Sequence, residues 1–422
     1  MRFCKKKVHL QKNYRETAVI STKEAEKLIL SLIPLSKSKR VDIEALDSFT
    51  LRQRCFSDRS YPPFDRVALD GIATHYQQYQ KYWCIQEMQK AGEPPTKLLS
   101  HQNGIEIMTG AVLPEGCDTV LRYEDLIIKD GQASLKEGST VRPFLNVHRT
   151  GTDCDQGDLL FDTGTRLTPV HWGALAAIGS HSVEVSCMPR IALVSTGDEL
   201  VGVRAKPAAH QIRASNSYAL LSALRSFGFR HITLAQTEDS SSKMQTLFDT
   251  LLNAHDLLIV SGGVSAGKFD LVPTVLREIG VTQVFHKIRQ KPGKPFWFGM
   301  GAPDKPVFGL PGNPQASLIC LYRYVLPALR KMQGLDKQRP LYAKLSTPCS
   351  KKFHPLSEMT RFVPVSAFCD EHAMICAHTI ETQGSGDFIS LSKSKGFVEI
   401  PENELFHEGH PYPLYLWTES SL

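Results

Sequence analysis

The sequence of 422 residues lacks the patterns by which several classes of protein are recognised. Its ten cysteines are scattered without a CxxC pair or a finger-like spacing, which argues against a zinc module and favours free thiols in a reducing compartment. No apolar run is long enough to span a bilayer, and no such run follows the basic residues 5–7, so we expect neither a membrane span nor a targeting signal. These absences predict a cytoplasmic protein without a membrane partner.

The chain also has little excess charge. Its 49 Lys and Arg residues against 43 Asp and Glu residues give a formal net charge of +6, which permits anionic ligands but does not indicate nucleic-acid binding. The glycine-rich stretch 262–268 does not end in Gly-Lys-Ser/Thr, so it is not an ATP-binding P-loop. No Ser-His-Asp or Cys-His constellation is apparent, and His286 and His354 are isolated, so a protein nucleophile is not expected.

A glycine-rich stretch at residues 261–270 is the strongest positive signal, because it follows an apolar run, 256–260, that is typical of a buried strand. Glycine allows positive φ and close approach to a ligand, so consecutive N–H groups can point at one anion. The helix expected over residues 271–280 adds partial positive charge at its N-terminus. The stretch predicts a phosphate-binding turn, although such turns also serve tight packing alone. Its predicted binding residues are Ser261, Gly262, Gly263, Ser265 and Gly267.

Two further loops carry related signals. Lys291 and Lys294 lie in the turn Lys-Pro-Gly-Lys-Pro, and lysines on a rigid turn suit anion binding, although solvated surface lysines are the alternative. Residues 309–314 (Gly-Leu-Pro-Gly-Asn-Pro) lie between an apolar strand and a helical run. Loops at the carboxyl ends of parallel strands line one crevice, so the three loops should converge on one ligand. The third loop contributes Pro311, Gly312, Asn313 and Pro314 as predicted binding residues.

The order of expected elements indicates an α/β multidomain protein. Residues 22–33 are typical of a helix with a serine or threonine cap. Residues 188–336 alternate strands and helices, which predicts a three-layer α/β/α domain with a mostly parallel sheet. Residues 76–149 mix short strands with Gly and Pro turns, which indicates a small β-rich domain. After residue 340 short strands return, which indicates a C-terminal β-barrel-like domain.

Other motifs lie outside these loops, at residues 62–65 (Pro-Pro-Phe-Asp), 68–71 (Ala-Leu-Asp-Gly), 107–111 (Ile-Met-Thr-Gly-Ala), 114–116 (Pro-Glu-Gly), 149–153, 195–200 (Ser-Thr-Gly-Asp-Glu-Leu) and 215–216 (Ser-Asn). With the three loops, this ordered set resembles the molybdopterin molybdotransferase family, which contains the MoeA proteins and the gephyrin E domain. The resemblance covers nearly the whole chain. It implies four domains: a discontinuous, elongated α+β N-terminal domain (1–60 with 150–187), a β-rich domain (61–149), a molybdopterin-binding α/β domain (188–336) and a C-terminal barrel domain (337–422).

The resemblance implies insertion of molybdenum from molybdate into adenylylated molybdopterin, with Mg²⁺-dependent cleavage of the pyrophosphate and release of AMP, in molybdenum cofactor biosynthesis. It also implies contact with the adenylyltransferase of the same pathway. A homodimer is implied as well, because Asp70, Thr109 and Asp153 match family residues that face the crevice of the partner subunit. The implied catalytic residues are Asp70, Thr109, Glu199, Asp239, Asp270, Lys291 and Lys294. Further implied binding residues are Asp153, Thr196, Gly197, Asp198, Ser215 and Asn216.

The carboxylates also have a chemistry of their own. A carboxylate beside a bound phosphate is repulsive unless a divalent cation bridges the two, so we expect Asp270 to help place Mg²⁺, with Glu199 as the second ligand. Asp198 and Glu199 follow a strand, and the alternative for them is a helix N-cap with first-turn acids. Helix capping is likewise the alternative for Asp239.

The departures from the family pattern include three residues that bear on activity. Arg66 and Val67 stand where the family commonly has Asn and Ser, polar groups that face the cleft, and Lys268 stands where it usually has Glu. Arg66 supplies an anion contact, or it marks an altered substrate preference or lost turnover. The alternative function is therefore a catalytically altered or inactive paralogue that acts as a pterin or molybdate carrier or as a scaffold. A different phosphoanhydride hydrolase is a further alternative, and the polar motifs outside the α/β domain favour the transferase over both.

Overall fold

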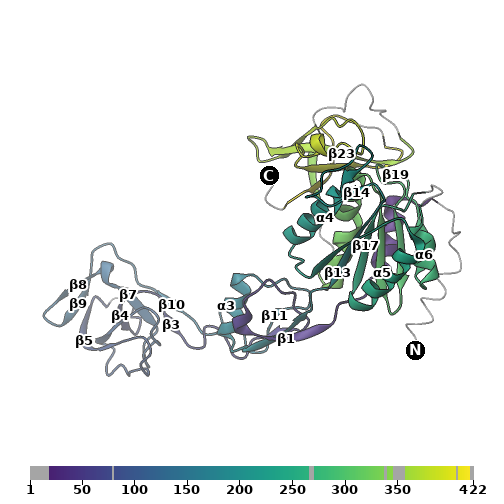
Figure 1. Ribbon diagram of the computed structural model, residues 1–422. Coiled ribbons are helices and arrows are strands. Elements are labelled where there is room, and N and C mark those ends of the chain that lie inside the picture. Colours follow the sequence, from purple (N-terminus) through teal and green to yellow (C-terminus); the bar gives the residue numbers. More distant parts are fainter. Residues whose placement is uncertain are drawn as a thin grey trace. The chain divides into compact units, whose positions relative to one another are not determined.

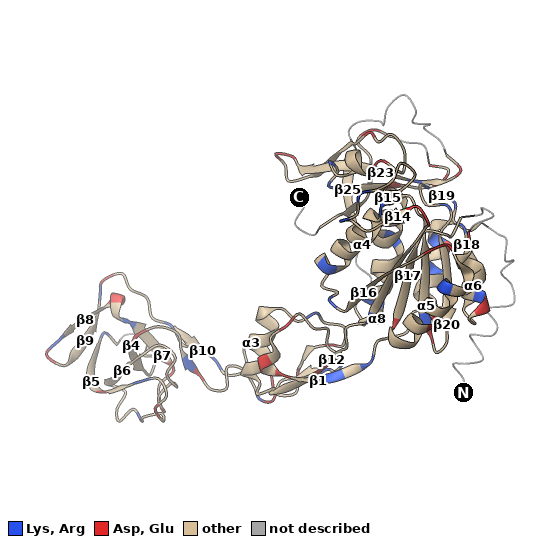
Figure 2. Ribbon diagram, viewed as in Figure 1, with Lys and Arg blue, Asp and Glu red and all other residues tan. Residues whose placement is uncertain are grey.

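The computed structural model describes residues 19–77, 80–265, 270–336, 340–345, 357–404 and 407–418 (Figure 1). The chain forms two compact units: a first unit of residues 1–39 and 185–422, and a second unit of residues 40–184. Basic and acidic residues are interspersed over both units, as the small net charge leads one to expect (Figure 2). Within the described part of the chain, no helix combines the length and the apolar character needed to cross a membrane.

A six-stranded sheet forms the centre of the first unit. Its strands, in spatial order, are β16 (Ile232–Thr237), β13 (Ile191–Thr196), β17 (Leu257–Ser261), β21 (Lys305–Leu310), β20 (Trp297–Gly301) and β18 (Thr282–His286). The first four run parallel, as predicted, whereas β20 pairs antiparallel with both β21 and β18. The expected alternation of strands and helices ends at β18, because antiparallel neighbours need no crossover helix.

Helices cover both faces of this sheet. One face packs against α2 (Thr22–Leu32), α4 (Ser215–Ser226), α7 (Pro314–Cys320), the π-helical turn η3 (Leu321–Val325) and α8 (Leu326–Met332), and the other packs against α5 (Ser241–Ala254) and α6 (Val272–Glu278). In β13, Ile191 and Leu193 lie in the first core and Ala192 and Val194 in the second, because successive side chains of a strand point to opposite faces. Burial on both faces explains why the central strands are continuous apolar runs.

The helix predicted over residues 22–33 is confirmed as α2. Ser21 caps it, because the Ser21 side chain accepts from the N–H of Glu24 and the Glu24 carboxylate accepts from the N–H of Ser21. Its apolar face packs in the core of the first unit, whereas residues 40–60 lie in the second unit. The division of the chain into four domains remains a prediction.

The C-terminal part of the first unit is a closed barrel. Its strands are β22 (Leu341–Leu345), β23 (Thr360–Cys369), β24 (Ile375–Thr379), β25 (Gly396–Ile400) and β26 (Pro411–Leu416), with the short helix α9 (Phe388–Leu391) before β25. The ring closes because β23 pairs with β24 on one side and with β25 on the other. Strand β19 (Gln290–Lys291) adds to β23 in parallel, so the turn that carries the two lysines, the lysine loop (residues 291–294), is attached to the barrel.

A second sheet forms the centre of the second unit. Its strands, in spatial order, are β7 (Thr119–Arg122), β4 (Gly71–Thr74), β6 (Asn103–Ile107), β5 (Tyr82–Gln89), β9 (Gln132–Leu135) and β8 (Leu126–Lys129). The short pairs are β3 (Arg66–Val67) with β10 (Val147–His148) and β2 (Cys55–Phe56) with β11 (Leu159–Phe161). This unit also contains helix α3 (Pro169–Ala177) and the 3₁₀ turns η1 (Ile43–Ala45) and η2 (Tyr123–Asp125). Strands β1 (Ser38–Asp42) and β12 (Ser182–Ser186) pair where the chain passes from one unit to the other.

Candidate active site

The carboxyl ends of four parallel strands meet at one edge of the first unit's sheet. Ser195 of β13 lies opposite Ser261 of β17, which lies opposite Leu310 of β21. Strand β18 runs in the same direction as β21, since both pair antiparallel with β20, so the lysine loop also leaves this edge. The structure thus brings the three loops singled out in the sequence to the edge at which ligands bind in open α/β sheets.

The turn after β17 requires glycine. Gly262 has φ +102° and Gly263 has φ +64°. A Cβ atom on Gly262 would lie 2.5 Å from the carbonyl oxygen of Thr196, so a side chain there would displace the backbone. The N–H of Gly262 donates to the carbonyl oxygen of Leu310 (3.1 Å), and a Cβ atom on Gly312 would lie 3.8 Å from the Cα atom of Gly262. The glycine turns after β17 and β21 therefore lie in contact.

Acidic side chains occupy the loops after β13 and β16. The hydroxyl of Thr196 donates to Asp239 Oδ1 (2.7 Å), and the N–H of Asp239 donates to Asp198 Oδ1 (2.9 Å). The carboxylate of Glu199 lies over Gly197, because a Cβ atom on that glycine would be 2.6 Å from Glu199 Oε2. Two neighbouring loops thus bring three carboxylates to the sheet edge.

The capping alternatives for these acids are wrong. No helix begins at Asp198 or Glu199, because the next element is the strand β14 (Leu200–Val201), which pairs with β15 (Ile212–Arg213). Helix α5 has Ser240 as its N-cap, so Asp239 lies one residue too early to cap it.

A polar layer lies beneath the glycine turns. Asn216 Nδ2, on α4, donates to the carbonyl oxygen of Gly312 (2.7 Å) and to Ser261 Oγ (3.3 Å). Ser261 Oγ lies 3.3 Å from Ser317 Oγ on α7. The buried hydroxyl of Ser195 has no hydrogen-bond partner among the described residues. Two predicted binding residues, Ser261 and Asn216, therefore contact each other directly.

The remaining predicted binding residues of the first unit lie at the ends of the same elements. Ser215 is the first residue of α4, Pro314 is the first residue of α7, and Ser265 ends the described part of the glycine-rich turn. Asn313 Nδ2 donates to Ser385 Oγ of the barrel (2.9 Å). The turn after β21 is thus held by the barrel as well as by α4.

The lysine loop has a fixed backbone and exposed lysines. The carbonyl oxygen of Lys294 accepts from the N–H groups of Ile288 and Phe296, both at 2.9 Å. Gly293 has φ +94°, and the side chains of Lys291 and Lys294 are exposed. The two lysine side chains are therefore exposed on a turn whose backbone is held by hydrogen bonds to the residues before and after it.

Asp270 follows the glycine-rich turn and acts electrostatically on His286 at the end of β18. Burial lowers the pKa of His286, so the imidazole is neutral at pH 7, and its Nε2 lies 2.7 Å from the carbonyl oxygen of Val264. His286 thus holds the glycine-rich turn rather than standing alone. Residues 19–77, 80–265, 270–336, 340–345, 357–404 and 407–418 contain no group of three or more His, Cys, Asp or Glu able to hold a metal ion.

In the second unit, two aspartates are held by threonines. Asp70 Oδ1 accepts from the N–H (2.6 Å) and the hydroxyl (2.7 Å) of Thr109, and these hydrogen bonds lower the pKa of Asp70. Asp65 Oδ1 accepts from the N–H (2.8 Å) and the hydroxyl (3.0 Å) of Thr150. The β4–β6 pairing places the segment after Asp70 beside the segment before Thr109, which brings this aspartate and this threonine together.

Arg66, His148 and Asp153 form a chain of contacts across the β3–β10 pair. Arg66 Nη2 lies 3.2 Å from His148 Nδ1, and His148 Nε2 lies 3.0 Å from Asp153 Oδ1. A guanidinium can only donate, so His148 Nδ1 accepts from Arg66 and the ring N–H at Nε2 donates to Asp153. The ring thereby lies between the exposed guanidinium of Arg66 and the carboxylate of Asp153.

Known proteins match this chain along nearly its whole length. Residues 20–179 match the family described as "MoeA N-terminal region (domain I and II)", residues 192–331 match "Probable molybdopterin binding domain", and residues 346–417 match "MoeA C-terminal region (domain IV)". The molybdopterin molybdenumtransferase of Synechocystis sp. is 35% identical over 404 residues, which cover 94% of this chain and 100% of that protein. The chain belongs to the molybdopterin molybdenumtransferase family.

Other members of the molybdopterin molybdenumtransferase family agree. The enzyme of that name from Haemophilus influenzae is 29% identical over 390 residues, covering 91% of this chain and 95% of that protein. The crystal structure of a molybdopterin biosynthesis MoeA protein from Pyrococcus horikosii superposes with a TM-score of 0.76 at 28% identity, covering 95% of this chain and 100% of that one. The resemblance found in the sequence is confirmed, and with it the class of enzyme, a transferase of molybdenum cofactor biosynthesis.

Departures from the family's usual residues now have a structural context. Val67 is 1% exposed and lies in the core of the second unit, whereas Arg66 is exposed. Gly267 and Lys268 lie outside the described residues. Sequence reasoning missed Ser317, which lies in an apolar helix without a motif, and Ser385, whose Gly-Ser-Gly setting indicated only a turn.

Proposed function

We propose that the chain is a molybdopterin molybdenumtransferase that inserts molybdenum from molybdate into adenylylated molybdopterin, with Mg²⁺-dependent cleavage of the pyrophosphate and release of AMP. One observation carries this proposal: glycine turns, acidic loops and a lysine loop share one sheet edge. The chain is also 35% identical to an enzyme of that name over that enzyme's full length, which supports the proposal.

The substrates require binding of several anionic groups at once. Backbone N–H groups at the Gly262 and Gly312 turns and the ammonium groups of Lys291 and Lys294 suit the phosphates and molybdate, because preorganised donors stabilise charge that develops during reaction. Helix α4 adds the partial positive charge of its N-terminus at Ser215, next to Asn216. Their common position at the sheet edge supports these binding roles.

Mg²⁺ suits the acidic part of the site as an ion that is shared between the protein and the substrate. In phosphoryl chemistry this ion is held by one or two carboxylates together with substrate phosphates and water, so a complete protein cage is not required. Glu199 and Asp270 are the carboxylates we assign to it. Bound there, the ion would supply Lewis-acid polarisation of the pyrophosphate.

The chemistry needs no protein nucleophile. The two thiols of the pterin bind molybdenum and displace one oxo group of molybdate, which leaves as water with the two thiol protons. Attack of a water molecule on the phosphoanhydride leaves a phosphate on the pterin and releases AMP. Asp239 and Asp198, linked through the N–H of Asp239, orient the loops that face the pyrophosphate. The protein therefore has to hold molybdate, the pyrophosphate and the pterin in the relative positions that the reaction requires.

Asp70, Thr109 and Asp153 belong to the second unit, and we assign them to the site through a homodimer in which they serve the partner subunit. Arg66 adds a positive charge to this group of side chains. The adenylyltransferase that supplies the pterin is the expected partner, and the cytoplasm is the expected location.

AMP release by the purified protein tests the proposal. Adenylylated molybdopterin is incubated with Mg²⁺, with and without molybdate, beside Asp270→Asn and the control Asp249→Asn, which changes an exposed carboxylate on α5. We expect molybdate-dependent release of AMP that Asp270→Asn abolishes and Asp249→Asn does not. Tight binding of the pterin without any AMP release would instead establish the carrier function.

A further inference from the structure

The lysine loop is built over a buried glutamine. Gln290 is 1% exposed, although the next residue, Lys291, is exposed. Gln290 Nε2 donates to the carbonyl oxygens of Pro292 (3.3 Å) and Gly293 (3.1 Å). Both carbonyl groups lie between the two lysines in the chain, so one buried amide holds the backbone that joins them.

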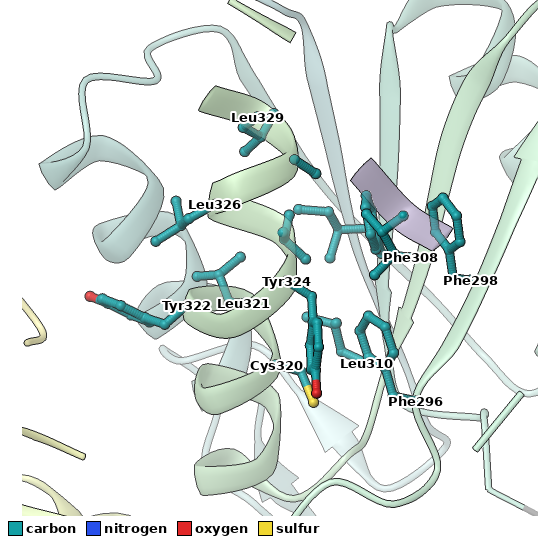
Figure 3. Packing of buried hydrophobic residues seen from close by; sticks show 14 of the residues in the cluster. Phe296, Phe298, Phe308, Leu310, Cys320, Leu321, Tyr322, Tyr324, Leu326 and Leu329 are labelled. Carbon is teal, nitrogen blue, oxygen red and sulfur yellow. The ribbon is translucent and has the colours of Figure 1, made fainter. Parts of the chain in front are cut away.

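Tyr324 fixes the orientation of this amide. The hydroxyl of Tyr324, a fully buried residue of η3, donates to Gln290 Oε1 (2.5 Å). Carbonyl oxygens only accept, so Nε2 must face the loop and Oε1 must face the hydroxyl. The ring of Tyr324 packs on Phe296 with centroids 4.9 Å apart, and Figure 3 shows Tyr324, Phe296 and Cys320 gathered at one end of the core.

The loop leaves no free space around the amide. Gly293 has φ +94°, and a Cβ atom there would lie 2.6 Å from Gln290 Nε2 and 3.0 Å from Cys320 Sγ. Gln290 Nε2 itself lies 3.4 Å from Cys320 Sγ. Movement of the amide therefore requires movement of the lysine loop.

We propose that Gln290 and Tyr324 are positioning residues for the oxyanion or phosphate group that Lys291 and Lys294 bind. Their contact fixes the loop from inside the core, so that both ammonium groups are presented at the sheet edge without a loss of loop entropy on binding. The inference rests on the proposed function of the two lysines. Without the tyrosine hydroxyl, a buried amide oxygen is left unpaired, which favours rearrangement of the amide and of the loop.

The test uses Tyr324→Phe in the full chain, with Tyr322→Phe as the matched control. Tyr322 is also buried and lies on the same π-helical turn, but its hydroxyl donates to the carbonyl oxygen of Trp417 instead of to the lysine loop. We expect Tyr324→Phe to weaken binding of AMP and of molybdate, measured by calorimetry, by about tenfold, the effect of one lost hydrogen bond. Tyr322→Phe should lower Tm by about as much as Tyr324→Phe does, but it should leave the affinities for AMP and for molybdate unchanged.

Gln290→Leu, and the double variant that combines it with Tyr324→Phe, test whether Gln290 and Tyr324 act as a unit. The double variant should bind AMP no more weakly than the weaker single variant, because each change removes the same contact. In steady-state turnover, we expect each of these variants to have a raised KM for the adenylylated pterin and a nearly unchanged kcat. A loss of stability alone does not produce this pattern.

The lysine variants separate failure of this inference from failure of the proposed function. If Lys291→Ala and Lys294→Ala bind AMP and molybdate like the unchanged protein, the assigned role of the loop and the inference both fall. If the lysine variants lose affinity while Tyr324→Phe and Tyr322→Phe behave alike, the lysine role stands and the positioning role is overturned.

Discussion

At the scale of single residues, Asp65 and Asp70 are held by the same device. Each carboxylate accepts, through one oxygen, the N–H and the hydroxyl of one threonine. Such bonds stabilise the ionised form, as the lowered pKa of Asp70 shows. Arg66 lies between these aspartates in the chain and contacts His148, so the same short segment carries two carboxylates and one cation.

Arg66→Asn tests whether this cation contacts the substrate. We expect KM for the adenylylated pterin to rise by about tenfold and to depend less on ionic strength, because a charge-assisted contact is lost. Steady-state AMP release over a series of salt concentrations measures both effects. Arg54→Asn is the control, since Arg54 is an exposed arginine of the same unit that pairs with Asp162. An unchanged KM with an unchanged salt dependence would rule out the contact.

Gly262→Ala tests the glycine requirement of the turn after β17. The new Cβ atom would approach the Thr196 carbonyl oxygen to 2.5 Å at φ +102°, so we expect a loss of about 1–3 kcal/mol in the free energy of unfolding and a loss of AMP affinity. Gly384→Ala is the control, because Gly384 has φ +120° but no atom within 4 Å of its Cβ position. Equal effects of the two changes on unfolding by urea would contradict a steric role for Gly262.

At the scale of elements, the sequence pattern predicted those strands and helices whose formation depends on residues close together in the chain. Strands β13 and β17 were found because all their side chains are buried, and α2 because a serine cap precedes an amphipathic run. The antiparallel strand β20 was not anticipated, since an apolar run does not show its direction. The contact of Gln290 with Tyr324 joins residues 34 positions apart, which no local spacing indicates.

Arg323 of η3 shows why a long-range group cannot be found from the sequence. It is 6% exposed and pairs with Glu26 of α2 (3.1 Å) and Glu399 of β25 (2.8 Å). Those two acids come from opposite ends of the chain and carry no motif. The three residues connect the N-terminal helix, the π-helical turn and the barrel.

Arg323→Met should therefore destabilise the first unit strongly. Removal of the guanidinium takes the cationic partner from the buried Glu399 and the partly buried Glu26, for which we expect a loss of about 3–5 kcal/mol in the free energy of unfolding by urea. Arg190→Met removes an arginine from the exposed pair with Asp256 (3.1 Å) and should cost less than about 1 kcal/mol. Similar losses in the two variants would show that the buried group does not hold these elements together.

At the scale of the whole molecule, the candidate residues fall into two units of one chain. The first unit carries the glycine turns, the acidic loops and the lysine loop, and the second carries Asp70, Thr109 and the Arg66–His148–Asp153 contacts. Family membership explains why both sets are present. The proposed homodimer gives both sets one substrate.

In the proposed reaction, this chain transfers molybdenum to the pterin and releases AMP in one coupled step. The most direct measurement determines, in a single incubation with adenylylated molybdopterin, Mg²⁺ and molybdate, both the AMP released and the molybdenum retained by the pterin. We predict equal amounts of the two, and neither product when molybdate is left out. Release of AMP without molybdate, or pterin that stays adenylylated and free of molybdenum, would contradict the proposed reaction.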